Sequence, residues 1–422
     1  MIGTRERLSF AAGDLGFNFV WQSIELYLLY FYVRVIGLSP EAASAIFLAG
    51  ALIDWLIDPL VGVLIDRAAS RVSMRGWVLA GGSAAGVALV AAFAQPRLPA
   101  GWMLGYALAT HLILRATYSL GNIPYGALTT RISSDPDDHV VLTAVRMQGA
   151  AIGGLIAAIV YAVLPARGPH ASADFVTGAI LLGVLAQPAF LATYFGVRER
   201  IILPTRVGGT SGQDIAGLFG LLKRSPELRR LLVTVLVAGL SVTVMNKSIL
   251  FLFDRLDAVR LSYVAAGIPP LSLLLTAPVW LHLARRFGCV ATLTMAAGLY
   301  VATALALPLA GSTRIGLVAA LTVALTAGSG MSVMFWALLP RVVYLVEHQR
   351  DGEACAARVY ALAGIARKLA QALAPQFVAF GLMLSSGRSV VPGIITVGLM
   401  TLATIVAYRP RDLEVPRSPA GI

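Results

Sequence analysis

The sequence predicts an all-α integral membrane protein, with twelve transmembrane helices arranged as two six-helix bundles. Of its 422 residues, 58% are hydrophobic and only 13% are charged, whereas a soluble domain has about 25% charged residues. Apolar stretches of about 20 residues recur along the chain, and each is long enough to cross a bilayer. The longest polar connection falls near the middle and divides the stretches into two sets of six.

The spans are separated by arginine, proline or glycine-rich turns. They are expected at residues 10–33, 41–65, 77–96, 102–127, 141–164, 176–197, 230–253, 262–284, 290–310, 314–340, 356–382 and 389–408. Residues 198–229 are polar, basic and glycine-containing, with a short surface helix expected at 214–223. We therefore predict an N-terminal bundle over 1–197, a cytoplasmic linker over 198–229 and a C-terminal bundle over 230–422.

The basic residues orient the predicted helices. If the N-terminus is inside, the inner loops hold about three times as many Lys and Arg residues as the outer loops, which is a positive-inside signal. Both termini are then cytoplasmic. The net charge of +12 belongs to loops beside anionic lipid and not to a basic face that would bind nucleic acid. We expect a monomer in a bacterial inner membrane, with lipid as its surroundings and no nucleic-acid partner.

A short motif follows the second predicted span. Gly62, Asp66, Arg67 and Arg71 lie in GVLIDRAASR, which resembles the G-x-x-x-D-R-x-x-R loop of the major facilitator superfamily. The equivalent connection of the second half reads HLARRFG, and such repetition is typical of transporters that rock one half against the other. The arginines alone would fit a purely topological role, but Asp66 would not. We expect these residues to form a conformational loop.

Two acids stand one helical turn apart in the apolar stretch LIDWLIDPLVG. Asp54 and Asp58 share one helix face, about 6 Å apart along the axis. Two carboxylates so close in a low dielectric need a positive partner. That partner is a sodium ion, a proton, or a basic side chain such as Lys368, Arg146 or Arg115. The first two make a cation site, with Asp54 and Asp58 as metal ligands if the ion is sodium, and the third makes a structural ion pair.

Two further helices carry polar stripes. On the first span, three polar residues at i, i+4 and i+7 share a face: Asn18, Gln22 and Glu25. On the fourth span, five polar or small residues share another: His111, Arg115, Ser119, Asn122 and Gly126. These faces predict a water-filled cavity for a polar solute, with Glu25 and Arg115 able to pair with each other. Hydrogen bonds between helices are the alternative, which we favour for Ser119.

Three longer segments carry a family resemblance. They are GDLGFNFVWQSIELYLLYFYVRVIGLSPEAASAIFLAGALIDWLIDPLVGVLIDR, SLGNIPYGALTTRISSDPDD followed by Arg146, and FWALLPRVVYLVEHQRDGEACAARVYALAGIARKLAQALA. Together they resemble the glycoside–pentoside–hexuronide cation symporters, and the likeness spans nearly the whole chain. The resemblance implies that Asp54 and Asp58 hold the coupling cation, that Lys368 lies near them, and that Arg146 lies beside the sugar.

Three positions of the expected solute site depart from the family pattern. Asn18 and Asn122 stand where members of the family have aspartates that hold sugar hydroxyls, and Gly126 stands where they have a tryptophan. The departures argue against a melibiose-like galactoside and favour protons over sodium.

The resemblance and the buried charges together predict a symporter that couples a proton or sodium ion to a sugar, glycoside or related polar organic solute. Asp54, Asp58 and Lys368 are the expected coupling residues. The expected solute-binding residues are Asn18, Gln22, Glu25, Arg115, Asn122 and Arg146. The alternative is a proton-coupled exporter of a hydrophobic or lipid-like compound. Without a metal-ligand cluster, a nucleophile elbow or a phosphate loop, we expect no enzyme and no cofactor beyond the coupling cation.

Overall fold

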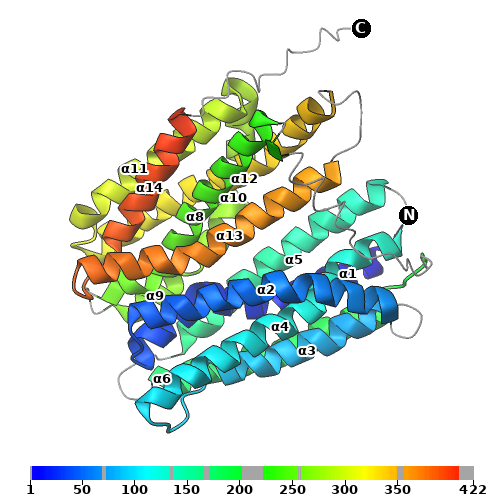
Figure 1. Cartoon of the computed structure of the whole chain (residues 1–422), viewed down its shortest axis with the longest axis horizontal. Coiled ribbons are helices and arrows are strands. Elements are labelled where there is room, and N and C mark those ends of the chain that lie inside the picture. The colour runs from blue at the N-terminus through cyan, green and yellow to red at the C-terminus, as the bar shows by residue number, and fades with distance from the viewer. Residues whose placement is uncertain are drawn as a thin grey trace. The chain divides into compact units, whose positions relative to one another are not determined.

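The computed structural model describes residues 2–68, 73–133, 136–164, 171–201, 222–223, 225–254, 256, 258–348 and 356–407. Within these ranges the regular elements are helices, and no strand occurs in them (Figure 1). The chain divides into two compact units. The first comprises Met1–Gly209 with Asp257–Pro270, and the second comprises Thr210–Leu256 with Leu271–Ile422. The predicted all-α class is confirmed.

The first unit contains the six helices predicted for the N-terminal half. They are α1 (Thr4–Gln22) with its continuations η1 (Ser23–Leu28) and η2 (Phe31–Val35), α2 (Pro40–Ala68), α3 (Met74–Ala92), α4 (Ala100–Ile132), α5 (Pro136–Val163) and α6 (Ala171–Gly196). The short helix α9 (Val259–Ala265) comes later in the chain but also belongs to this unit.

The first span changes helix type in its middle. From Ser23 the backbone follows two π-helical segments, η1 and η2, in place of the α-helix. The Ser23 hydroxyl donates a hydrogen bond to the Phe19 carbonyl at 2.7 Å, a side-chain bond of the kind that competes with the backbone ladder. π-Helical segments inside α-helices are frequent at functional sites, and this one contains Glu25.

The second unit contains the remaining helices. They are α8 (Pro226–Asp254), most of α10 (Ile268–Phe287), α11 (Cys289–Ala310), α12 (Arg314–His348), α13 (Ala356–Leu384) and α14 (Val391–Ala407). In the two units together, eight helical stretches of the described residues are long and apolar enough to cross a membrane. Most of the predicted linker 198–229, including the helix expected at 214–223, lies outside the described residues, so the predicted domain boundaries stay a prediction.

Both units use the same helix pairs. In the first unit, α1 packs on α5 and α6, α3 packs on α4 and α6, and α2 packs on α4. In the second unit, α8 packs on α13 and α14, and α11 packs on α12 and α14. The fifth pair, α10 with α12, is joined by the Trp280 indole, which donates to the Thr326 carbonyl at 3.1 Å. Five helix pairs therefore recur in both units, and the second unit also packs α8 on α12.

Small residues allow the first unit's helices to approach closely. A Cβ atom at Gly121 would lie 2.7 Å from the backbone nitrogen of Gly82, and one at Gly153 would lie 2.7 Å from the Leu15 carbonyl oxygen. A larger residue at either position would push α4 from α3, or α5 from α1. Such contacts are typical of helix packing in membranes, where small side chains permit close packing. They fix the relative positions of the helices that carry the polar stripes.

Helix α2 has two different faces. Leu52, Leu56 and Leu60 are exposed, as expected for side chains that meet lipid, whereas Asp54 is only 5% exposed. The acid therefore points into the first unit. The sequence motif LIDWLIDPLVG is thus an amphipathic stretch whose polar face is turned toward the neighbouring helices.

Candidate functional site

An ion pair joins α2 to α4 inside the first unit. Arg115 donates from Nε to Oδ1 of Asp54 at 3.2 Å and from Nη2 to Oδ2. Both carboxylate oxygens therefore face the guanidinium, in the two-pronged geometry that makes Arg–carboxylate pairs strong. Both side chains are largely shielded from solvent. The structure thus brings Asp54 to Arg115, one of the three basic partners that the sequence offered.

The same guanidinium lies against an aromatic ring of α1. The Arg115 Cζ atom is 5.2 Å from the centre of the Trp21 ring, within the range of a cation–π interaction. Gly50 of α2 leaves room for α4 at this level, because a Cβ atom there would lie 2.7 Å from Nε2 of His111 and 3.3 Å from Cγ of Arg115. The pair is therefore enclosed by side chains from three helices.

His111 closes the other side of this region. Its ring is buried, and its Nδ1 atom lies 3.4 Å from the Tyr32 hydroxyl. The Phe47 ring packs against it at 4.7 Å between centres. His111 is therefore held among aromatic rings next to the Asp54–Arg115 pair.

A second ion pair joins α1 to α5. Arg146 Nε lies 3.3 Å from Oδ1 of Asp14, and Asp14 is 6% exposed. The Arg146 guanidinium also lies over the Tyr125 ring, 5.2 Å from its centre. The predicted solute-binding arginine thus has a carboxylate partner and an aromatic platform.

The sequence analysis missed Asp14. It stands four residues before Asn18, so it extends the stripe of Asn18, Gln22 and Glu25 by one helical turn on the same face. The Asn18 amide donates to the Asp14 carbonyl at 2.8 Å. Extending the stripe toward the N-terminus would have found this acid.

Aromatic rings from α1 and α4 connect the two ion pairs. Trp21 contacts Tyr118, with 5.5 Å between ring centres, and Phe17 contacts both Tyr118 and Tyr125 at 5.6 and 5.5 Å. We call Phe17, Trp21, Tyr118 and Tyr125 the aromatic row. One end of it carries the Arg115 guanidinium and the other end carries that of Arg146. The sequence analysis did not single out these rings, which look like ordinary membrane aromatics until α1 and α4 are packed together.

Two residues of the fourth-span stripe lie beside this row. The Asn122 amide donates to the Tyr118 hydroxyl at 2.9 Å. At Gly126, a Cβ atom would meet nothing nearer than Nη1 of Arg146 at 4.0 Å. The glycine therefore leaves open space next to the Arg146 guanidinium.

The remaining predicted residues occupy several environments. Gln22 packs against Gly154 of α5, where a Cβ atom would lie 3.3 Å from its side chain, and Glu25 is buried within η1. Asp58 is half-buried on α2. Lys368 is exposed on α13 of the second unit. The roles expected for these four residues stay predictions.

The predicted conformational loop begins inside a helix. Helix α2 runs to Ala68, so Gly62, Asp66 and Arg67 belong to its last turns and not to a loop. Arg71 lies outside the described residues. The expected role of the motif stays a prediction.

Charged contacts also close one end of the first unit, before the predicted first span. Glu6 of α1 accepts hydrogen bonds from the Arg200 guanidinium at 2.7 Å and from the Arg198 backbone at 2.9 Å. Burial raises the pKa of the Glu6 carboxyl, but these bonds lower it, and the net shift is downward. Nearby, the Arg75 Nε lies 3.3 Å from Glu199. These pairs tie the start of α1 and of α3 to the chain that follows α6.

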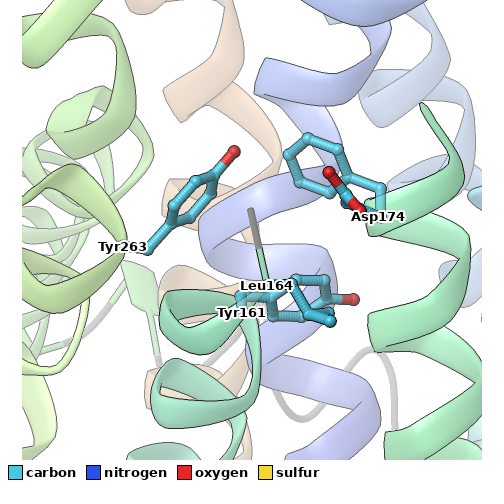
Figure 2. Close-up of a pocket in the computed structure, with 5 residues that line it drawn as sticks. Tyr161, Leu164, Asp174 and Tyr263 are labelled. Atoms are coloured by element: carbon cyan, nitrogen blue, oxygen red, sulfur yellow. The ribbon is translucent and has the colours of Figure 1, made fainter. Parts of the chain in front are cut away.

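A pocket lies elsewhere in the first unit, beside Tyr263 of α9 (Figure 2). Its empty space is about 150 Å³, part of it open to the outside, and it is lined by Tyr161, Leu164, Asp174, Phe175 and Tyr263. Tyr27 lies tilted against Tyr161 and stacks on Tyr263, with 4.2 and 5.9 Å between ring centres. The pocket contains none of the predicted site residues, and its rings hold the α9 segment against α5 and α6.

No group of three or more His, Cys, Asp or Glu side chains that could hold a metal ion occurs in the part of the chain that the structure describes. Asp54, the first of the two expected ligands, has both of its carboxylate oxygens directed at Arg115. This arrangement suits an ion pair better than a sodium ion.

Comparisons with known proteins agree with this architecture. Residues 9–406 match the family described as MFS/sugar transport protein. The chain is 28% identical over 375 residues to the symporter YnaJ of Bacillus subtilis, and the match covers 87% of this chain and 80% of YnaJ. It is 25% identical over 206 residues to the isoprimeverose transporter of Lactiplantibacillus pentosus, covering 48% of this chain and 43% of that protein.

A solved structure has the same fold. A bacterial homologue of the iron transporter ferroportin superposes with a TM-score of 0.69 over 97% of this chain and 100% of that one, at 14% sequence identity. At this identity the likeness concerns the fold alone. With the family match over almost its whole length, the chain belongs to the MFS/sugar transport protein family, and its resemblance to the glycoside–pentoside–hexuronide cation symporters is confirmed.

Proposed function

We propose that this protein is a symporter that uses a proton or sodium gradient to move a sugar, a glycoside or a related polar organic solute across a bacterial inner membrane. The observation that carries the proposal is the aromatic row with an Asp–Arg pair at each end. Binding sites for small molecules combine apolar and aromatic walls with a few placed polar groups. This row offers both inside an otherwise apolar bundle.

The solute side of the proposal centres on Arg146. Its guanidinium is partly exposed, rests on Tyr125 and borders the open space at Gly126. A sugar there would meet charged donors and acceptors from Arg146 and Asp14 and a ring face from the row. Asn18 lies on α1 with Asp14, and Asn122 lies on α4 with Tyr125. Each would add an amide group to the site. The match to a relative named for isoprimeverose transport supports a sugar or glycoside.

The coupling side of the proposal centres on α2. Asp58 is the first candidate for the residue that takes up the cation, Asp54 is the second, and Lys368 is a further candidate for coupling. A carboxylate with a bound cation is neutral as a unit, so the loaded carrier can close around it. An empty, charged site would resist closure because charge is costly to bury in the membrane.

The proposal is tested by uptake into membrane vesicles. The wild type is compared with Asp58→Asn for a panel of labelled sugars, glycosides and uronides, each under an imposed proton or sodium gradient. We expect the wild type to accumulate at least one of these solutes. Asp58→Asn should lose accumulation against a gradient but keep exchange of internal for external solute, because exchange needs no net cation movement.

Asp174→Asn is the matched control, since Asp174 is another partly buried aspartate of the first unit but lies by the pocket of Figure 2. It should accumulate solute like the wild type. Concentrative uptake that is unchanged in Asp58→Asn would remove Asp58 from coupling. If inward proton flow instead drove the efflux of every transported solute, the protein would be an exporter and not a symporter.

A further inference from the structure

One short helix of the first unit comes from the second half of the sequence. Helix α9, Val259–Ala265, lies between α8 and α10 in the chain, yet it packs on α5 and belongs to the first unit. Helix α8 and most of α10 belong to the second unit. The chain therefore passes from the second unit to the first after Leu256 and returns to the second at Leu271.

Tyr263 is the residue that anchors α9. Its ring stacks on Tyr27 of η1, with 5.9 Å between centres, and meets Phe175 of α6 edge to face at 6.0 Å. Tyr263 is only 1% exposed. Tyr161 of α5 faces the same pocket (Figure 2). A single ring of α9 is thus packed among rings from three elements of the first half of the chain.

The helix is interrupted between α9 and α10. The sequence predicts one continuous span over 262–284, but Ala266 and Gly267 lie in neither helix. Pro269 and Pro270 follow in the first turn of α10. Because proline has no N–H group, these residues cannot donate the i→i−4 bonds that would join α10 to the end of α9. Helix α9 can therefore change its angle to α10 without the loss of helical hydrogen bonds at this point.

The docked position of α9 leaves one polar atom without a partner. Within the part of the chain that the structure describes, the Tyr27 hydroxyl is buried and makes no hydrogen bond. A buried hydroxyl in this state opposes the closed arrangement because it has lost its bonds to water. Ring packing holds Tyr263 beside Tyr27, and the unsatisfied hydroxyl works against it. This balance suits a contact that opens and closes.

We propose that residues 258–267 are a strap that holds the outer end of the first unit closed through Tyr263 and is released once in each transport cycle. In the predicted topology, the chain between the seventh and eighth spans faces outside. Transporters of this architecture rock one half against the other. A short segment joined at both ends to the second unit is drawn with that unit when the halves move apart at this end. The inference rests on the proposed function, because it assigns the step that opens the carrier outward.

The first test detects release of the strap without any solute. Cys289 and Cys355 are replaced by serine in the full-length protein, and a single cysteine is introduced as Tyr263→Cys or, as the matched control, Phe93→Cys. Phe93 is also fully buried and stacks on Phe175 at 5.8 Å, but it lies outside the strap. A membrane-impermeant maleimide added outside intact cells should label Tyr263→Cys at least tenfold faster than Phe93→Cys. Equal rates would overturn the inference.

A second pair of variants repeats this comparison without the loss of a ring. Ala266 in the strap and Ala179 in α6 are both fully buried, and a cysteine is only slightly larger than an alanine. Ala266→Cys should again be labelled at least tenfold faster than Ala179→Cys. Labelling of Ala266→Cys at the rate of Ala179→Cys would show that the strap stays docked, even if Tyr263→Cys had been labelled because it folds poorly.

The second test locks the strap with a disulfide bond. A Cβ atom at Gly267 would lie 3.6 Å from that of Ala158 on α5, within the usual range for a disulfide. The double variant Ala158→Cys with Gly267→Cys, without the two native cysteines, should take up solute when reduced. Oxidation should lower uptake at least tenfold, and dithiothreitol should restore it. Full uptake by the oxidised variant would overturn the inference, because the strap would then stay docked throughout the cycle.

Gly239→Cys with Ala370→Cys is the matched control for this disulfide. A Cβ atom at Gly239 would lie 3.3 Å from that of Ala370, and α8 and α13 both belong to the second unit. Its oxidation should change uptake by less than twofold. An equal loss in the control would mean that any disulfide between helices stops transport, and would overturn the special role of the strap. If the wild type transports none of the test solutes, the proposed function fails, and the labelling test still decides whether the strap opens.

Discussion

The two units place different kinds of polar group in their interiors. The first unit holds charged pairs, Asp54 with Arg115 and Asp14 with Arg146. In the second unit, hydroxyl groups connect α10 to α12, the counterpart of the α2–α4 pair, because the Thr276 hydroxyl lies 2.7 Å from that of Ser329. The Ser241 hydroxyl lies 2.8 Å from that of Thr401, and the Tyr300 hydroxyl donates to the Ser241 carbonyl at 2.8 Å, which together link α8, α11 and α14.

This difference distinguishes contacts that hold helices together from contacts that could bind a solute or a cation. Hydroxyl bonds between helices are a common means of association in membranes and contribute modestly. A buried ion pair has a large desolvation cost, so its presence is weak evidence for a purely stabilising role. The α2–α4 pair therefore has a charged contact where its counterpart, α10–α12, has a hydroxyl contact. We place the solute and coupling residues mainly in the first unit for this reason, although Lys247 of α8 is a buried charge in the second.

The largest expected effect comes from breaking the Asp14–Arg146 pair. Arg146→Met would leave Asp14 without this guanidinium, and removing one partner of a buried pair costs about 3–5 kcal/mol. Arg146 is partly exposed, so we expect the lower end of that range. Transport should fall ~100-fold, which is about 2.7 kcal/mol, because the variant lacks the guanidinium that we propose binds the solute.

The double variant Asp14→Asn with Arg146→Met sharpens this test. It removes the unpaired charge, so thermal stability should recover even though transport does not. Recovery of both stability and transport would mean that the Asp14–Arg146 pair has only a structural role. The two units would then not differ in the way described above. Uptake kinetics and unfolding temperature, measured in the same detergent, check the two properties separately.

A smaller effect is expected from two matched tyrosines. Tyr125 donates to the Phe10 carbonyl at 2.7 Å in the first unit, and Tyr300 donates to the Ser241 carbonyl at 2.8 Å in the second. Each change to phenylalanine removes one buried hydrogen bond and should lower the free energy of unfolding by about 1 kcal/mol. Tyr125→Phe should also change KM for the solute several-fold, because this ring supports Arg146, whereas Tyr300→Phe should not. Equal KM changes would contradict the division of roles.

The smallest effect concerns Glu6 and pH. The pKa of Glu6 is lowered in the folded state, so its charged contacts stabilise the protein above its unfolded-state pKa, near 4.5. That stabilisation should be lost as the pH falls through the lower folded-state pKa. From pH 8 to pH 5 the wild type should unfold at a slightly higher temperature than Glu6→Gln. The difference in the free energy of unfolding should be less than about 1 kcal/mol, because the pair is partly exposed. The advantage should shrink as the pH falls below about 4.5 and vanish once the Glu6 carboxyl is protonated in the folded state as well. An advantage that persists at that point would show that the contacts do not depend on the Glu6 charge.

Most of the helix pattern follows from the sequence, because length and hydrophobicity are local properties. The predicted span 102–127 lies within α4, Ala100–Ile132, and the span 290–310 corresponds to Cys289–Ala310. The change to π-helix at Ser23 was not predicted. The change concerns which backbone carbonyl accepts each N–H hydrogen bond. An apolar stretch of sequence does not indicate that choice.

The candidate site was only partly predictable. The stripes of α1 and α4 identified Asn18, Arg115 and Asn122 as inward-facing, because helical periodicity places such residues on one face. Which acid would meet which base was open, since Arg115, Arg146 and Lys368 were equally suitable partners for Asp54. Asp14 was overlooked because it stands alone in the sequence, one turn before the polar stripe.

The sequence by itself determined the membrane class, the twelve spans and the presence of buried charge. Hydrophobic length and the cost of an ionisable group in lipid operate residue by residue along the chain. Only the tertiary structure decided that Asp54 binds Arg115, that Asp14 binds Arg146, and that four aromatic rings lie between them. Those choices depend on how close the helices approach, which is set by glycines such as Gly50, Gly121 and Gly153 and is realised only when distant segments pack.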